Sequence, residues 1–330
     1  MKNKKITIKD VAKQSGVSIA TVSQILNGND QKFSPKTVEK VLAAKVALNY
    51  EPDYFARRMI MKKSKTIGVL VPDITNPFFS TLVRGIEGIL YRENFVTMLC
   101  NADLDTKKEI DYLEELSRRG VDGYIIASSA ISNQAINETL RKKNFPYIVL
   151  DQKKAEGFSD AVLTDDFSGG KMAAEHFKQL NHKKVAVVLP KDATENIQTR
   201  LIGFQTIYPE VELIYAELSK TGGRQAASAI VKTDVTAIFA INDELAFGLY
   251  LGLADMGKKI PQDYSVIGYD NIDMCEYVTP QLTTIAQPIY ELGQITAGLL
   301  LERVAQPEKD WEEKTLPVQL IQRFSTAHLK

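Results

Sequence analysis

One face of the stretch between Ile19 and Asn27 carries side chains that are small or uncharged, where a surface helix normally carries Lys and Glu. Such a face suits close approach to a partner surface. A helix-turn-helix places the second of its two helices in the major groove of DNA. The pattern therefore indicates a DNA-reading helix, and the alternative is a pair of small helices in an ordinary bundle.

A second group of polar residues follows predicted strands, at the points where the strands end: Asn76, Asp151, the pair Asn242-Asp243, and Asp270. In open parallel sheets, ligands bind outside the carboxyl ends of the strands. Two facing lobes would bring these groups together across a cleft. A single Asp or Asn of this kind is more simply a helix cap or turn former, but four at equivalent strand ends favour a shared ligand site.

Two short helices must present the DNA-reading face. Thr7 and Asp10 are spaced as a capping box at the start of the first helix, and Gly16 suits the turn that follows it. Ser18 is the expected N-cap of the second helix, whose apolar stripe begins at Val22.

Ser34-Pro35 has the form of a cap and a first-turn proline, which predicts a third helix over the first two. Residues 52–63 then form a segment with four basic residues that is too short to be a stable helix alone. It needs a partner, either a second copy or a nucleic acid. The alternative is a solvated basic linker.

The charge distribution favours a nucleic acid. Residues 1–63 hold thirteen basic residues against five acidic ones, a net charge of +8, whereas the remaining residues of this neutral 330-residue chain carry −8. A basic head on an acidic body is the electrostatic pattern of a nucleic-acid-binding module.

The composition argues against several other classes of protein. No apolar run approaches the ~20 residues of a membrane helix, and no signal-peptide core is present. Two Cys without a CxxC spacing, and three His, indicate a reducing cytoplasm and no structural zinc site. Common catalytic motifs such as GxSxG, the P-loop and HExxH do not occur. We therefore expect a cytoplasmic protein that is not an enzyme and has no metal or cofactor.

From Thr66 onward, short apolar runs alternate with helical stretches. Nine strands are predicted, at residues 66–72, 95–101, 122–128, 146–151, 161–166, 184–190, 212–218, 237–243 and 264–270. Continuous apolar strands between helices indicate an α/β fold with doubly wound parallel sheets. KTIGVLVP at 65–72 is similar to KKVAVVLP at 183–190, which predicts two similar lobes.

Motifs along nearly the whole chain then point to a family. They are DVAKQSGVSIATVSQILN, LNYEP, ARRM, IGVLVPDITNPFF, RGIE, VDGYII, FAINDELAFGL, VIGYDN, LTTIAQP and LPVQLIQRFST. In this combination the chain resembles the lactose-repressor (LacI/GalR) family of bacterial transcription regulators. The resemblance implies an all-α helix-turn-helix domain joined to a two-lobed domain similar to periplasmic binding proteins.

The resemblance also implies a homodimer that binds a pseudo-palindromic operator in double-stranded DNA. Ile19, Ala20 and Gln24 match the base-reading positions of the family. Gln24 can pair with an adenine edge, and the other two offer apolar contact to a thymine methyl. The neighbouring polar side chains suit phosphates: Ser18, Thr21, Ser23 and Asn27.

Residues 52–61 match the hinge helix of the family, two of which pair in the minor groove. Arg57 and Arg58 would lie along the groove walls, and Met59 stands where the family inserts a Leu between base pairs. An effector that changes the lobes would separate the two hinges and withdraw this wedge.

The same resemblance places a small sugar effector between the lobes, with ribose or a related pentose or ketose as the leading candidate. Phe78 and Phe79 match aromatic positions that stack on a sugar ring, close to Asn76. The positions that match hydrogen-bonding partners of sugar hydroxyls are Asp151, Arg200, Asn242, Asp270 and Gln287. Gln152 follows Asp151 where the ribose-type pattern has Arg, so this chain departs from that pattern.

The expected domains are the helix-turn-helix at 1–50, the hinge at 51–63 and the effector domain at 64–330. The first lobe is expected at 64–157 and 286–313, and the second at 158–285 and 314–330. A dimer is favoured over a tetramer, because no heptad pattern follows the last family motif.

Two rival functions remain open from the sequence. One is a catabolite-control regulator whose DNA binding depends on a phosphorylated carrier protein. The other is a plain sugar-binding protein, against which the basic head argues.

Overall fold

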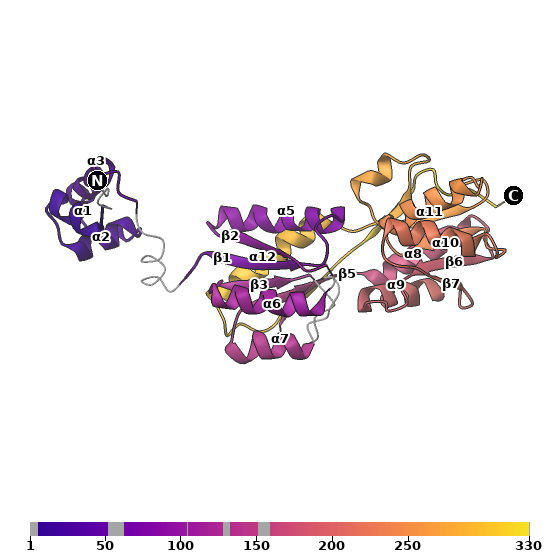
Figure 1. Ribbon diagram of the computed structural model, residues 1–330, viewed down its shortest axis with the longest axis horizontal. Coiled ribbons are helices and arrows are strands. Elements are labelled where there is room, and N and C mark those ends of the chain that lie inside the picture. The colour runs from indigo at the N-terminus through magenta and orange to yellow at the C-terminus, as the bar shows by residue number, and fades with distance from the viewer. Residues whose placement is uncertain (1–5, 52–62, 104, 128–132, 151–158, 330) are drawn as a thin grey trace. The chain divides into compact units, whose positions relative to one another are not determined.

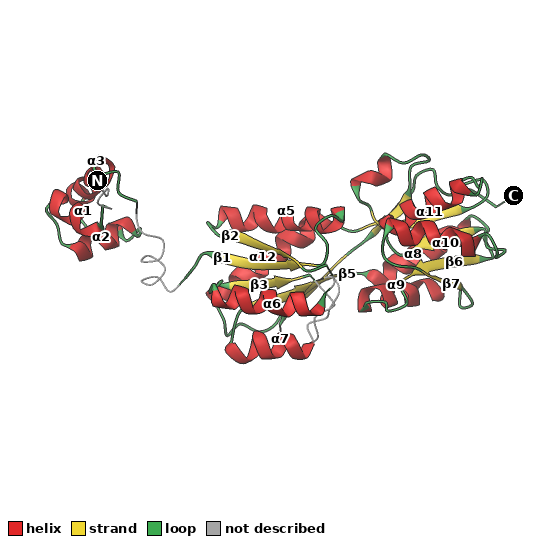
Figure 2. Ribbon diagram, in the orientation of Figure 1, coloured by secondary structure: helices red, strands yellow, loops and turns green. Residues whose placement is uncertain are grey.

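The computed structural model describes residues 6–51, 63–103, 105–127, 133–150 and 159–329. The chain divides into two compact units, Met1–Ser64 and Lys65–Lys330. The described residues of the first unit form helices and the turns between them, and the second unit alternates strands and helices (Figure 1; Figure 2). No helix among the described residues is long and apolar enough to span a membrane.

The first unit contains α1 (Ile8–Ser15), α2 (Ile19–Leu26) and α3 (Pro35–Ala47), with a short 3-10 helix, Asp30–Lys32, before α3. The capping box predicted at α1 is present, because the Asp10 carboxylate accepts hydrogen bonds from the Thr7 backbone N–H at 2.9 Å and from its hydroxyl at 2.7 Å. Gly16 ends α1 in the left-handed region, with φ +71°.

The second and third helices begin at the predicted caps. Ser18 Oγ accepts the Thr21 N–H at 3.1 Å, and Ser34 accepts a backbone N–H at the start of α3. Val11, Val22 and Val41, one from each helix, are fully buried and form the centre of a small core. This core fixes which face of α2 remains exposed.

The second unit contains two six-stranded sheets. The first has the order β11-β5-β4-β3-β1-β2 and is parallel throughout. Its strands are β1 (Thr66–Val71), β2 (Val96–Asn101), β3 (Gly123–Ile126), β4 (Tyr147–Leu150), β5 (Asp160–Thr164) and β11 (Glu313–Leu316). Helices α5 (Pro77–Arg92) and α12 (Ile289–Ala305) pack together on one face, and α6 (Thr106–Arg118) covers the other beside α7 (Asn133–Thr139).

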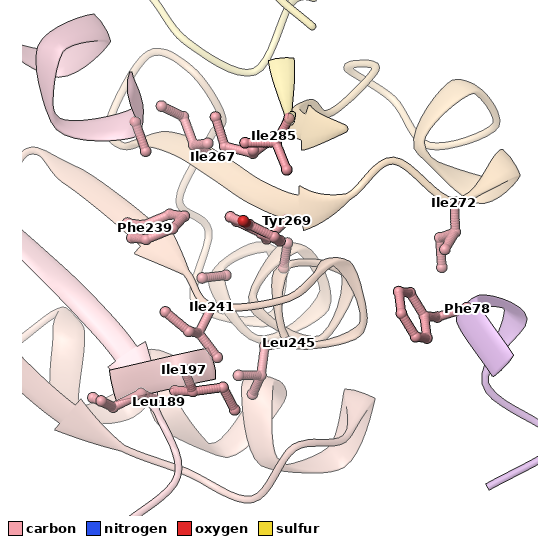
Figure 3. Close-up of a cluster of buried hydrophobic side chains, with 14 of the residues drawn as sticks. Phe78, Leu189, Ile197, Phe239, Ile241, Leu245, Ile267, Tyr269, Ile272 and Ile285 are labelled. Atoms are coloured by element: carbon pink, nitrogen blue, oxygen red, sulfur yellow. The ribbon is translucent and has the colours of Figure 1, made fainter. Parts of the chain in front are cut away.

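The second sheet has the order β12-β10-β9-β8-β6-β7, and only β12 is antiparallel to its neighbour. Its strands are β6 (Val185–Leu189), β7 (Glu212–Tyr215), β8 (Ala237–Ala240), β9 (Ser265–Asp270), β10 (Thr283–Ala286) and β12 (Gln319–Ile321). Two helix pairs cover it, α8 (Asp166–Gln179) with α9 (Glu195–Gln205) and α10 (Lys220–Ile230) with α11 (Asp243–Asp255). Figure 3 shows its buried core around Phe239, Ile267 and Tyr269.

The doubly wound α/β fold predicted from the sequence is confirmed. All nine predicted strands are present, as β1 to β9. Three further strands, β10, β11 and β12, have no counterpart among the predicted ones. Central strands such as β1 and β9 are buried along their whole length, as parallel strands covered on both faces must be.

The strand pairing corrects the expected lobe boundaries. β5 pairs in parallel with β4, and β11 pairs in parallel with β5, so both belong to the first sheet. The boundary expected at residue 158 therefore moves past Thr164, and the one expected at residue 314 moves past Leu316. The chain passes between the sheets three times: from β5 to α8, from β10 to α12, and from β11 to β12.

Candidate functional site

The exposed face of α2 consists of the residues expected to read bases. Ile19, Ala20 and Gln24 are exposed, and the Ile19 side chain keeps 45% of its surface in solvent. Val22 and Ile25 of the same helix are buried against α1 and α3. The core of the first unit therefore leaves these three side chains accessible to a partner.

The residues expected to contact phosphates flank this face. Ser18 is exposed, and its hydroxyl lies 2.9 Å from that of Thr21. Ser23 and Asn27 are half-buried and share a hydrogen bond of 3.4 Å, donated by the Asn27 amide. The remaining predicted DNA contacts, Arg57, Arg58 and Met59, lie outside the described residues.

The residues expected to bind an effector come together in the second unit. They line one cavity of about 110 Å³, together with Pro72, Asp73, Thr194, Asn196, Ile197 and Leu218. The predicted residues in its lining are Asn76, Phe78, Phe79, Arg200, Asn242, Asp270 and Gln287. The eighth predicted residue, Asp151, lies outside the described part of the chain.

Two asparagines of this cavity are also helix caps. Asn76 Oδ1 accepts the Phe78 N–H at 2.9 Å at the start of α5, and Asn242 Oδ1 accepts the Leu245 N–H at 2.9 Å at the start of α11. Each asparagine is therefore both a helix cap and a lining residue of the cavity, the two interpretations that the sequence left open. Capping uses one of the two lone pairs of the amide oxygen, so each side chain retains its NH₂ group and a second lone pair for a ligand.

Arg200 is held in a fixed position by groups behind it. Its Nε donates to Asp166 Oδ1 at 2.8 Å, its Nη1 donates to the Ile241 carbonyl at 3.0 Å, and its guanidinium lies 3.7 Å from the centre of the Tyr269 ring. Tyr269 also donates its hydroxyl to Asp166 Oδ1. Burial raises the pKa of the Asp166 carboxyl, although Arg200 opposes the shift. These contacts fix the orientation of the guanidinium in the cavity wall.

Asp270 stands at the carboxyl end of β9 in an unusual backbone conformation. Its φ is +119°, and that of Asn271 is +59°. Its carboxylate accepts the Gln287 Nε2 at 2.7 Å. Non-glycine residues in this region are strained by about 1–3 kcal/mol each and persist where the surroundings hold them. The turn therefore aims a buried carboxylate at the cavity.

Asp243 lies behind this turn and does not line the cavity. It is fully buried, and it accepts hydrogen bonds from Thr284 Oγ1 at 2.7 Å, the Ile272 N–H at 3.0 Å and the Cys275 thiol at 3.1 Å. Although Asp243 follows Asn242 in sequence, only Asn242 lines the cavity. Among the described residues, no group of three or more His, Cys, Asp or Glu could hold a metal ion.

Sequence reasoning missed three polar residues of the cavity: Asp73, Thr194 and Asn196. Thr194 and Asn196 lie at the start of α9, in the connection that leaves the carboxyl end of β6. The strand-end rule applied to Asn76 and Asp270 covers this connection too, so the same rule could have found them. Asp73 could have been found in the same way, since it follows β1 by two residues.

Two protein families match the sequence. Residues 7–53 match the bacterial regulatory proteins of the lacI family, and residues 174–326 match the periplasmic binding protein-like domain. The transcriptional repressor PurR of Photobacterium profundum is 33% identical over 332 residues, which cover 98% of this chain and 99% of that protein.

Solved structures agree with these matches. A LacI family transcriptional regulator from Enterococcus faecalis V583, crystallised with bound ribose, is 69% identical with a TM-score of 0.78 and covers 80% of this chain and 100% of that chain. The lac repressor dimer bound to operator and the anti-inducer ONPF is 25% identical with a TM-score of 0.85, over 98% of this chain and 100% of that one. The chain therefore belongs to the lacI family of bacterial regulatory proteins, a family without enzymatic activity, and it is a DNA-binding transcriptional repressor.

Proposed function

We propose that this repressor controls a sugar-utilisation operon in the cytoplasm, that it binds its operator as a homodimer, and that ribose or a related pentose is its effector. The observation that carries the effector proposal is the cavity itself, around which seven residues expected for a sugar site lie together. The 69% identity to a regulator crystallised with ribose supports the same choice. The lac repressor, a dimer on its operator, supports the oligomeric state.

The chemistry of the cavity lining suits a sugar. Each hydroxyl of a sugar both donates and accepts, and the lining supplies acceptor oxygens from Asp270 and donors from Arg200 and Gln287. Phe78 and Phe79 add an apolar wall, with ring centroids 5.0 Å apart and edge-to-face geometry. Such a wall can pack against the C–H face of the sugar ring.

The side chains on α2 are suited to direct reading of a DNA sequence. Gln24 can form two hydrogen bonds with one adenine, and Ile19 can contact a thymine methyl. Ser18, Thr21, Ser23 and Asn27 would contact phosphates. Arg57, Arg58 and Met59 would engage the minor groove, so that ligand binding to the lobes can be coupled to DNA binding.

Isothermal titration of the full-length protein against a panel of pentoses, hexoses and sugar phosphates tests the effector. We expect ribose or a close relative to bind at one site per chain, and Asp270→Asn to weaken this binding by about tenfold or more, because a buried charged hydrogen-bonding group is lost. Asp273→Asn is the matched control, since Asp273 lies three residues away and is exposed.

If no pentose gives a binding signal in the titration, the effector proposal is ruled out. If operator binding then required a phosphorylated carrier protein, the catabolite-control function would replace it.

A further inference from the structure

Thr164 lies where the chain first passes from one sheet to the other. It is the last residue of β5, and Asp166 already begins α8. Its side chain is 4% exposed. No role follows for it from the sequence motifs, and it does not line the cavity.

The Thr164 hydroxyl contacts a residue of the cavity in another interlobe segment. Thr164 Oγ1 donates a hydrogen bond of 2.8 Å to Gln287 Oε1. Gln287 lies between β10 and α12, in the second of the three passages between the sheets. Its other amide atom, Nε2, donates to Asp270 at 2.7 Å. The three side chains therefore form one buried chain of hydrogen bonds from β5 to β9.

A carboxamide has one accepting end and one donating end. The Asp270 carboxylate only accepts, so it holds the nitrogen of Gln287 toward β9 and the cavity. The Thr164 hydroxyl donates to the other end and holds the oxygen toward β5. Without this hydroxyl, the Gln287 oxygen would lose a buried partner and the carboxamide would be anchored at its nitrogen end alone.

The third passage between the sheets is tied to the first one at the neighbouring residue. Asp165 N–H donates to the Leu316 carbonyl at 2.9 Å, at the end of β11. Thr164 and Asp165 thus bond directly to both of the other interlobe segments. A change at Gln287 on ligand binding would reach all three segments through these two residues.

We propose that Thr164 is a positioning residue, which orients the Gln287 carboxamide and so couples the ligand in the cleft to the segments that join the lobes. The proposal rests on the proposed function, because it needs an effector that changes operator binding. Thr164 would then set how strongly the effector changes operator affinity, in addition to any change in the affinity for the effector or the operator alone. Coupling of this kind is measured as the ratio of operator affinities with and without effector.

The test compares four full-length variants with the wild type: Thr164→Val, Thr164→Ala, Thr164→Ser and Thr296→Val. Valine removes the hydroxyl at nearly constant volume, alanine removes it in a smaller side chain, and serine retains it. Thr296→Val is the matched control, because Thr296 is also buried but donates within its own helix, to the Leu292 carbonyl at 2.7 Å. Ribose affinity is measured by calorimetry and operator affinity by fluorescence anisotropy, with and without saturating ribose.

Thr164→Val and Thr164→Ala should each lose most of the effect of ribose on operator affinity, because the Gln287 oxygen is left without its buried partner. Thr164→Ser and Thr296→Val should retain the wild-type ratio. A thermal melt of each variant confirms folding, and the alanine variant answers the question if the valine variant does not fold.

The possible failures are distinguishable. If ribose binds the wild type but Thr164→Val and Thr164→Ala keep its full effect on the operator, the role of Thr164 is overturned while the proposed function stands. If ribose does not alter operator binding by the wild type, the proposed function fails and this inference fails with it. If Thr296→Val loses the coupling as well, the effect is not specific to the Gln287 contact, and the inference is again overturned.

Discussion

The Asp243 carboxylate occupies the space that a side chain at Gly268 would need. A Cβ atom built on Gly268 would lie 2.2 Å from Asp243 Oδ1. The two residues come from α11 and β9, and the carboxylate also accepts the N–H of Ile272 just beyond Asp270. The glycine of the VIGYDN motif is therefore required by a buried carboxylate that supports the turn at the cavity.

Gly268→Ala should destabilise the second unit. The new methyl group would meet Asp243 Oδ1 and, at 2.9 Å, Leu282 Cδ2. Overpacking of this kind costs about 1–3 kcal/mol, which urea denaturation measures. Gly298→Ala in α12 is the control, because a Cβ there has no neighbour within 4 Å, and alanine favours a helix by about 1 kcal/mol over glycine. Equal stability of the two variants would contradict this view of Gly268.

The stability of the fold should depend on pH through Asp243. Burial raises the pKa of this carboxyl from 3.8 to about 6, and the hydrogen bonds from Thr284 and Ile272 only partly oppose the shift. Between these values the folded state binds more protons than the unfolded one. Protonation of Asp243 therefore adds to the free energy of unfolding. This stabilisation is fully present below about pH 4, is lost as the pH rises through about 6, and amounts to about 3 kcal/mol in total.

Asp243→Asn isolates this contribution. The difference in unfolding free energy between wild type and variant should fall by about 3 kcal/mol from about pH 4 to about pH 7. Denaturation of both proteins in the same series of buffers gives that difference, and all other titrating groups cancel in it. Parallel pH profiles would show that Asp243 does not titrate in this range.

Gln24→Ala should relax DNA specificity at one base position. The amide is exposed on α2 and can pair with one adenine. Loss of that pair costs about 1–3 kcal/mol at the preferred base and little at the others. Binding to a set of single-base operator variants measures this, with Gln31→Ala, outside α2, as control. An equal loss of affinity for every operator variant would refute base reading by Gln24.

Arg200→Lys should weaken ribose binding by about tenfold or more, because an ammonium cannot bond Asp166 and the Ile241 carbonyl and still present a fork to the ligand. Calorimetry measures the loss. Arg224→Lys is the control, since Arg224 pairs with Asp255 at 2.7 Å on the exposed surface. A ribose affinity equal to that of the wild type would show that Arg200 is structural only.

The strands predictable from the sequence are those with continuous apolar runs, such as β1 and β9. β10 was not predicted because it begins with Thr283 and Thr284, and polar residues argue against a buried strand. The fold buries them by pairing their hydroxyls, Thr284 with Asp243 and Thr283 with the Arg323 N–H at 3.0 Å. These partners are distant in sequence, so no local pattern reveals them.

The site was predictable to a similar extent and for similar reasons. Strand ends and family motifs identify Asn76, Asp270 and Gln287, because those positions follow from local pattern. The functions of Asp243 and Thr164 depend on contacts between β9, β10 and β5 that only the folded chain shows. A motif marks a residue that lines the cavity, whereas the contacts that hold this residue in place come from distant parts of the chain.

The most direct test of the whole account is operator affinity of the full-length protein, measured by fluorescence anisotropy at fixed salt, with and without saturating ribose. The account predicts a change in affinity of about fivefold or more, and Asp270→Asn should need about tenfold more ribose to reach it. An operator affinity that stays the same in wild type while calorimetry shows ribose bound would contradict it.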